Sequence, residues 1–260
     1  MQKDVYDWEW FVKKFETISR IDLLAYKRPQ MERRINSFMK TVECPDYKSF
    51  VSLLEINLPV RQKFIEYLTI NVSEFFRNPD HWKVLEERII PQLLTHRTKL
   101  KVWSAGCSTG EEAYSLAMLF HAKFPGHVQK IKATDLDQEV LRKAIQAVYT
   151  GKAFKTLPPG YLHRYIQSDG DHYCVIEEIK RMVEFARHDL LRDKFELDHD
   201  LILCRNVFIY LTEESKQDLY RNFAQALRPG GVLFIGSTEQ IFRPAQAGFQ
   251  SLDTFFYQKI

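Results

Sequence analysis

The chain has 260 residues, and at about 100–200 residues per domain this suggests one large domain, or one of moderate size with a small companion. Hydrophobic residues make up 45% and charged residues 27%, with ten glycines and ten prolines, which excludes a disordered or collagen-like chain. The 37 basic and 34 acidic residues leave a net charge of +3, too small to indicate a nucleic-acid binder by itself.

The cysteines are scattered without the paired spacing of a zinc site, so we expect no bound metal: Cys44, Cys107, Cys174 and Cys204. The opening sequence, MQKDVYDWEWF, lacks the basic and apolar segments of a signal peptide. No stretch approaches the roughly 18 apolar residues that a membrane-spanning helix needs. We therefore expect a cytoplasmic protein with reduced thiols that does not insert into a membrane.

The first third of the chain has helical periodicity. Trp8, Phe11 and Phe15 recur at spacings of three or four residues, which places them on one helical face. Further helices are predicted from Pro29, after Asp46 and after Pro59, each with its own apolar face. Basic residues cluster on the second helix, and on their own they indicate a solvated face: Lys27, Arg28, Arg33 and Arg34.

From about Lys99 strands and helices alternate. Apolar runs predict strands at 100–105, 131–134, 201–204, 232–236 and 254–259, with helices between the earlier ones. This order indicates an α/β fold with a doubly wound parallel sheet. Short β-like pieces around the turn Ser168–Asp171 interrupt it, and we expect a small antiparallel insertion at about 155–187.

The loop after the first predicted strand, Gly106–Gly110, lies where open α/β sheets bind nucleotides. It is no Walker A motif, because Glu111 and Glu112 follow Gly110, and no GxGxxG motif, because residue 108 is serine. Two carboxylates at the start of a helix repel a pyrophosphate but suit a ligand with an ammonium group and a cationic centre. S-adenosylmethionine has both.

Asp135 ends the second predicted strand, where an acid accepts hydrogen bonds from ribose hydroxyls. NAD enzymes share this spacing, and an acid there also simply ends strands. Together, the loop, the acid pair and Asp135 favour a methyltransferase over a dehydrogenase.

Four blocks of the sequence resemble the signatures of the CheR chemotaxis-receptor methyltransferases: Asn71–Arg77 (NVSEFFR), Cys107–Glu112 (CSTGEE), Ala133–Asp135 (ATD) and Cys204–Tyr210 (CRNVFIY). Two further segments also resemble this family: Gly236–Glu239 (GSTE) and Phe255–Tyr257 (FFY). The resemblance covers nearly the whole chain. It implies an all-α N-terminal substrate-recognition domain with a linker at 1–69, and a Rossmann-like S-adenosylmethionine-binding catalytic domain at 70–260.

The resemblance also implies the residues of the site. The methionine end of the cofactor is expected at Asn71, Ser73 and Arg77, its ammonium at Glu112, and its ribose at Asp135. Asp189 and Leu190 are expected to border the adenine, although asparagine is frequent in the family at 189. Arg205 and Asn206 are expected to close the pocket, and Tyr210 to lie near the transferred methyl.

The implied reaction converts receptor glutamates to γ-methyl esters and releases S-adenosylhomocysteine. A glutamate with a pKa of about 4.3 is already ionised at neutral pH, so no general base is needed. Arg77 and Tyr210 are the expected catalytic residues, which orient the acceptor. Next to an acidic receptor bundle, Arg33 and Arg34 become candidate substrate-binding residues.

The turn at Ser168–His172 is short, so we expect no dependence on a tether peptide at the receptor C-terminus. We also expect a monomer that binds no nucleic acid. Two alternatives stay open. One is a methyltransferase of the same fold that acts on nucleic acid or a small molecule, although Arg205–Phe208 differs from the Asp/Asn-Pro-Pro-aromatic motif of DNA amino-methylating enzymes. The other is a non-catalytic module whose N-terminal helices read DNA.

Overall fold

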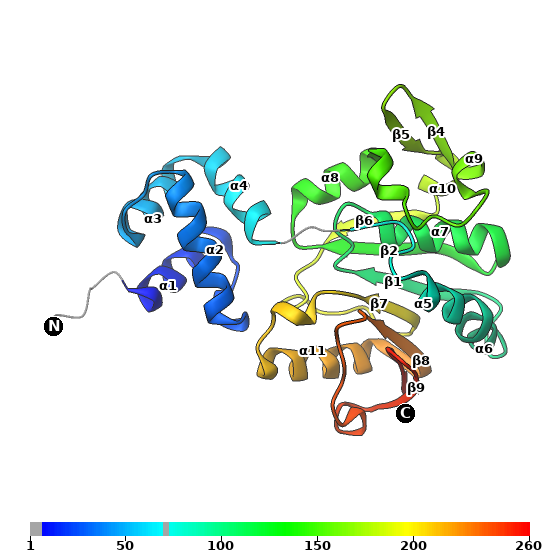
Figure 1. Ribbon diagram of the computed structural model, residues 1–260. Coiled ribbons are helices and arrows are strands. Elements are labelled where there is room, and N and C mark those ends of the chain that lie inside the picture. Colours follow the sequence, from blue (N-terminus) through cyan, green and yellow to red (C-terminus); the bar gives the residue numbers. More distant parts are fainter. Residues whose placement is uncertain (1–6, 70–72) are drawn as a thin grey trace. The chain divides into compact units, whose positions relative to one another are not determined.

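The computed structural model describes residues 7–69 and 73–260, and its contacts divide the chain into two compact units (Figure 1). The helical unit comprises Met1–Ile70 together with Tyr210–Lys216. The catalytic unit comprises Asn71–Ile209 and Gln217–Ile260. No helix within the described ranges is long and apolar enough to cross a membrane.

Residues 7–69 of the helical unit form four α-helices and a short 3₁₀ turn, Leu23–Ala25: α1 (Trp8–Ser19), α2 (Arg28–Thr41), α3 (Tyr47–Ile56) and α4 (Leu58–Leu68). Their starts follow from local chemistry. Asp46 accepts a hydrogen bond from the Ser49 N–H at 2.7 Å and caps α3, and Asn57 caps α4 in the same way. Pro29 stands in the first turn of α2, where its missing N–H has no helical partner to lose.

Phenylalanine rings form the centre of the helical unit. Phe50 of α3 lies 4.8 Å from Phe64 of α4 and 5.9 Å from Phe11 of α1, measured between ring centroids. Phe15 and Phe38 extend the cluster through contacts with Phe64. Such ring pairs add to the free energy gained by burying the apolar surface itself. The apolar stripes that predicted these helices therefore meet in one core.

A later segment joins the helical unit by backbone pairing. The Lys27 N–H donates to the Tyr210 carbonyl at 2.9 Å, and the Thr212 N–H donates to the Ala25 carbonyl at 3.0 Å. Between these bonds lies a β-bridge from Tyr26 to Leu211. Tyr210 thus belongs to this unit by its contacts, although the residue before it belongs to the catalytic unit.

The catalytic unit is built on a seven-stranded sheet in the order β6-β2-β1-β7-β8-β10-β9 (Figure 1). Five neighbouring strands are parallel: β6 (Val183–Arg187), β2 (Val128–Asp135), β1 (Leu100–Ala105), β7 (His199–Cys204) and β8 (Leu227–Ile235). At one edge β10 (Phe256–Lys259) and β9 (Phe249–Asp253) run antiparallel. The prediction of an all-α domain, followed along the chain by a Rossmann-like sheet, is confirmed.

Helices cover both faces of the sheet. One face packs, through alternate strand residues such as Val102 and Leu203, against helices from before and after β1. These are α7 (Glu111–Lys123), α8 (Gln138–Gln146) and the helical stretch of α5 (Pro79–Val84), a π-helical turn (Leu85–Ile89) and α6 (Ile90–Leu94). The other face packs against α11 (Glu213–Ala226). There the ring centroids of Trp103, on β1, and Phe223, on α11, are 5.7 Å apart. This alternation follows from the two-residue period of a strand.

The small sheet is antiparallel, as predicted, but its extent differs from the expected 155–187. Its strands are β3 (Val148–Tyr149), β5 (His172–Val175) and β4 (Ile166–Asp169), in that order, with short helices α9 (Tyr161–Tyr165), α10 (Glu177–Lys180) and a 3₁₀ turn (Gly151–Phe154) nearby. Val183–Arg187 belongs to the main sheet, parallel to β2. Its sequence, VEFAR, alternates like a hairpin strand and is half-exposed, but Val183 is buried in the larger core and Phe185 packs on Tyr114.

Candidate active site

The carboxyl ends of the parallel strands meet at one edge of the main sheet. The loops that follow β1, β2, β6, β7 and β8 leave the sheet there and carry most of the residues predicted for the site. In open α/β sheets this edge is where ligands bind.

The loop after β1 has left-handed backbone at three positions: Gly106 (φ 78°), Ser108 (φ 50°) and Gly110 (φ 93°). A Cβ on Gly106 would lie 2.7 Å from Val207 Cγ2, so glycine is required there for packing as well as for backbone freedom. Ser108 Oγ is buried and has no hydrogen-bond partner among the described residues. The loop therefore offers an unused polar atom at the edge where a cofactor binds.

Asp135, at the end of β2, is held by that loop. Its Oδ2 accepts the Ser108 N–H at 2.9 Å, and its Oδ1 accepts the Asp137 N–H at 3.0 Å. Burial raises the pKa of this carboxyl, and the two backbone donors oppose the rise. The carboxylate is thus oriented by the backbone while each oxygen keeps further lone pairs for a ligand.

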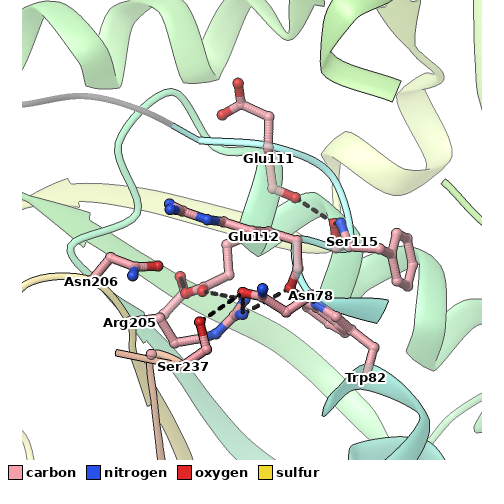
Figure 2. A network of polar contacts seen from close by, with 12 residues as sticks. Asn78, Trp82, Glu111, Glu112, Ser115, Arg205, Asn206 and Ser237 are labelled. Carbon is pink, nitrogen blue, oxygen red and sulfur yellow. Dashed lines mark hydrogen bonds and ion pairs between the residues drawn. The ribbon is translucent and has the colours of Figure 1, made fainter. Parts of the chain in front are cut away.

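Arg205 stands at the centre of a polar network that joins segments far apart in the sequence (Figure 2). Its Nη2 donates to the Arg77 carbonyl at 2.8 Å and to Asn78 Oδ1 at 3.0 Å, and its Nη1 lies 3.5 Å from Glu112 Oε2. Ser237 Oγ reaches the same Asn78 oxygen at 3.5 Å. The guanidinium also lies 4.7 Å from the centre of the Phe234 ring.

Glu112 and Arg205 form a nearly buried ion pair, with 13% and 3% of their side chains exposed. Burial lowers the pKa of Arg205 and raises that of Glu112, and in each case the charge of the partner opposes the shift. Ser104 Oγ donates to Glu112 Oε1 at 2.7 Å. Glu112, predicted to bind the cofactor's ammonium, therefore already serves as the counter-ion of Arg205, whose Nε is buried without a partner in the described part of the chain.

The two acids at the start of α7 point in different directions. In Figure 2 the Glu111 carboxylate points away from the Arg205–Glu112 pair. It accepts a hydrogen bond from Thr109 Oγ1 at 2.7 Å. Burial raises the pKa of Glu111, and hydrogen bonds from the Thr109 and Ser73 side chains oppose the rise. Sequence reasoning selected Glu112 alone, but Glu111 is the acid in contact with a residue predicted to line the methionine end.

The segment before α5 is fastened to α7 through Ser115. Ser115 Oγ accepts the Phe76 N–H at 2.9 Å and donates to the Glu111 carbonyl at 2.7 Å. The Arg77 carbonyl is bound by Trp82 Nε1 at 3.1 Å as well as by Arg205. Hydrogen bonds thus fix the backbone of the segment that carries Ser73 and Arg77. Asn71 lies outside the described residues.

Asp189 and Leu190 follow β6 at the same edge. Asp189 Oδ1 accepts the Leu191 N–H at 2.9 Å, so this side chain caps its own turn. The side chain of Asp193 accepts the Asp189 N–H at 2.8 Å. An asparagine oxygen can accept the same bond, so the turn tolerates either residue at 189. Leu190 is half-buried beside it.

The predicted substrate-binding residues, Arg33 and Arg34, lie in the helical unit. Arg33 is exposed on α2. Arg34 is half-buried, with its guanidinium 4.5 Å from the centre of the Tyr67 ring. Burial lowers the pKa of Arg34, and the nearby Tyr67 and Tyr210 hydroxyls oppose this. Tyr210, by the contacts given above, also belongs to this unit.

Sequence reasoning missed several residues that hold the site together: Asn78, Trp82, Ser104, Ser115 and Glu239. Asn78 follows a predicted block directly, and Glu239 lies inside one, but neither position shows its partner. Cys107, also in the loop after β1, is 1% exposed, and burial raises the pKa of its thiol well above the usual value, which disfavours the thiolate.

The two parts of the chain match two family models. Residues 6–69 match the all-alpha domain of the CheR methyltransferases, and residues 71–256 match their SAM-binding domain. The chain belongs to the CheR methyltransferases. It is 41% identical over 254 residues to a chemotaxis protein methyltransferase of Listeria monocytogenes, with 97% of each chain covered. It is 34% identical over 230 residues to one of Salmonella typhimurium, covering 84% of this chain and 78% of the other.

The matched SAM-binding domain confirms the predicted cofactor, S-adenosylmethionine, and the residues at the sheet edge suit it. The acidic side chains at this edge, Glu111, Glu112 and Asp135, suit a ligand that carries an ammonium, a sulfonium and ribose hydroxyls. Buried polar atoms without a protein partner, Ser108 Oγ and Arg205 Nε among them, remain for its own polar groups. This edge is therefore the candidate cofactor site.

Proposed function

We propose that this protein methylates glutamate side chains of chemotaxis receptors, giving γ-methyl esters and S-adenosylhomocysteine for sensory adaptation. The observation that carries the proposal is the buried Arg205–Glu112 pair, anchored to Arg77 and Asn78, in a chain that matches both domains of the CheR family. The names of its relatives, chemotaxis protein methyltransferase, support the class of acceptor.

The residues of the catalytic unit bind and orient in this proposal. When bound, S-adenosylmethionine supplies a methyl group made electrophilic by its sulfonium centre. Asp135 holds the ribose, and Asp189 and Leu190 border the adenine. Ser73, with Asn71 before it, lines the methionine end, with Glu112 on the ammonium side. Arg205 and Asn206 close the site.

The acceptor needs orientation and desolvation, not deprotonation. A glutamate side chain with a pKa of about 4.3 is ionised at neutral pH. We assign the catalytic roles to Arg77, whose guanidinium pairs with an incoming carboxylate, and Tyr210, whose hydroxyl donates a hydrogen bond to it. Removal of water from the carboxylate raises its reactivity.

Receptor recognition is assigned to the helical unit. Arg33 and Arg34 lie on α2, and a basic helix suits an acidic helical bundle in the cytoplasm. The turn between β4 and β5 is only two residues long, Gly170 and Asp171, which supports recognition without a receptor tether peptide. We propose a monomer that binds no nucleic acid. Saturable binding of an isolated receptor C-terminal peptide would contradict the tether part.

The reaction is tested by transfer of a labelled methyl group to a purified receptor cytoplasmic fragment, followed by mild alkali. The proposal predicts label on the receptor that alkali releases as volatile methanol, the signature of a carboxyl methyl ester. Alkali-stable label would contradict it and indicate N-methylation, and transfer to a nucleic acid or small molecule alone would favour the alternative acceptor class.

A further inference from the structure

The loop after β7, Arg205–Ile209, is enclosed by two glycines from neighbouring loops. A Cβ on Gly106 would lie 2.7 Å from Val207 Cγ2, and a Cβ on Gly236 would lie 2.7 Å from the Asn206 nitrogen. Both distances are shorter than any real Cβ contact. The loops after β1 and β8 therefore leave room for this one only because neither glycine carries a side chain.

A single buried carboxylate binds the backbone of this loop. Glu239 Oε2 accepts the N–H groups of Asn206 at 2.9 Å and Gly236 at 2.6 Å, and Oε1 accepts the Ile209 N–H at 3.3 Å. The residue is only 4% exposed. Because a carboxylate has acceptor sites on both oxygens, it can hold three donors that an amide of the same shape cannot. Glu239, in the loop after β8, thus binds the loop after β7 near both of its ends, at Asn206 and at Ile209.

Asn206 has a left-handed backbone conformation. Its φ of 62° lies in a region that is uncommon for residues other than glycine, and that asparagine adopts more readily than most. Backbone of this kind persists where the surroundings determine it, and it is concentrated at functional sites. In the view of Figure 2 the Asn206 carboxamide points towards the Arg205–Glu112 pair, and the backbone conformation of Asn206 sets this direction.

We propose that Glu239 is a positioning residue for methyl transfer, which holds the Arg205–Ile209 loop so that Asn206 faces the cofactor. The inference rests on the proposed function, since it gives Asn206 the task of closing the cofactor site. Glu239 itself acts through the backbone of Asn206. The hydrogen bond from the Ile209 N–H to Glu239 also positions the residue that immediately precedes Tyr210.

A double-mutant cycle in the full-length chain separates positioning from general stabilisation. The variants are Glu239→Gln, Asn206→Gly and their combination, and the readout is the dissociation constant of S-adenosylhomocysteine, measured by calorimetry on folded protein. Asn206→Gly removes the side chain and leaves a residue that accepts φ near 60°. Each single variant is expected to weaken binding about tenfold, and the double variant no more than Asn206→Gly alone.

A matched control comes from another buried carboxylate, Asp200, which is fully buried, accepts the Lys101 N–H at 2.8 Å and pairs with Arg228 at the opposite end of β7. Asp200→Asn is expected to lower the melting temperature as much as Glu239→Gln while the cofactor affinity stays the same. If Glu239→Gln does not fold, Glu239→Asp, which keeps the charge on a shorter side chain, takes its place with the same expected pattern.

Two results would overturn the inference: unchanged affinity in the Glu239 variant, or losses that multiply to about a hundredfold in the double variant. Failure of the proposed function looks different. In that case the wild-type chain binds S-adenosylhomocysteine but forms no alkali-labile ester on the receptor, and the cycle is still read from binding alone.

Discussion

The helical unit and the catalytic unit bury different kinds of side chain. Within the described ranges, the buried residues of the helical unit are all apolar, with Phe11, Phe15 and Phe50 at its centre. The buried polar and charged side chains all lie in the catalytic unit: Ser104, Glu111, Ser115, Thr134, Asp137, His188, Asp189, His199, Asp200, Arg205 and Glu239.

The contrast indicates a division of tasks. A buried charge is costly unless partners are already in place, so the groups around Arg205 and Glu239 keep one geometry, as transfer between two aligned groups requires. Charges on α2 such as Arg33 stay in water, where they act over a longer range and are screened by salt. The contrast fits the proposal that the catalytic unit positions the cofactor and the helical unit recognises the receptor.

The largest expected effect is loss of the central cation. Arg205→Met leaves Glu112 buried without its partner, and we expect the free energy of unfolding to fall by about 3–5 kcal/mol, with S-adenosylhomocysteine binding lost. Urea denaturation and calorimetry measure the two quantities. Arg228→Met, which breaks the buried pair with Asp200, is the control: it should cost similar stability and leave cofactor affinity intact. Equal loss of affinity in both variants would contradict a specific role for Arg205.

The second prediction concerns pH, to which only the unit with buried ionisable groups should respond strongly. Burial, and then the charge of Lys101, lower the pKa of His199 from 6.5 to about 4. Between these values the unfolded chain binds a proton that the folded chain does not, so stability is lost as the pH falls from 6.5 towards 4, by about 3 kcal/mol in total.

His199→Phe isolates that contribution. Glu111, Glu112, Asp135 and Glu239 have raised pKa values, and each contributes with the opposite sign as the pH falls. The difference between wild type and variant cancels these groups. We expect the free energy of unfolding, measured by urea denaturation, to fall less steeply from pH 6.5 to 4 in the variant. Parallel curves would show that His199 does not titrate as a buried group.

The third prediction concerns Asp135. Asp135→Asn keeps an oxygen for the Ser108 N–H but turns the other acceptor into a donor, which opposes the Asp137 N–H and the ribose hydroxyls. We expect the affinity for S-adenosylhomocysteine to fall by about 2 kcal/mol, with a smaller change in melting temperature. Asp137→Asn, an equally good cap for α8, is the control and should bind normally. A normal dissociation constant in Asp135→Asn would remove this residue from the site.

The smallest expected effect lies in the helical unit. Arg33→Glu reverses an exposed charge, and we expect the KM for a receptor fragment to rise at low salt by an amount equivalent to about 1 kcal/mol, with cofactor affinity unchanged. Lys14→Glu makes the same change in net charge on α1, where the side chain is also exposed, and should have less effect. An equal rise in both variants would mean that net charge, not the position of Arg33, matters.

What could be predicted depended on how local each signal is. Helix starts at Asp46 and Pro29 and the strand ending in Asp135 follow from neighbouring residues, and they were predicted correctly. Partners brought together by folding were not. Asn78 and Arg205 lie 127 positions apart, and Glu239 and Asn206 lie 33 apart. Their side chains are ordinary polar residues in sequence, and only the converging loops make them partners.

Two structural differences have the same origin. Val183–Arg187 alternates like a strand of a small hairpin, and it lies beside β2 because Val183 and Phe185 pack against the core of the main sheet. Tyr210 follows a catalytic-unit strand in sequence, but the β-bridge between Tyr26 and Leu211 joins its segment to the helical unit. Neither contact leaves a trace in the local pattern of residues.

A salt series on the wild-type protein tests the division of tasks most directly. The dissociation constant of S-adenosylhomocysteine and the KM for a receptor fragment are measured together from about 20 mM to about 500 mM NaCl. Our account predicts a nearly constant affinity for S-adenosylhomocysteine, set by buried groups, and a KM that rises steadily as salt screens α2. A KM that does not respond to salt, or an affinity for S-adenosylhomocysteine that weakens in step with it, would contradict the account.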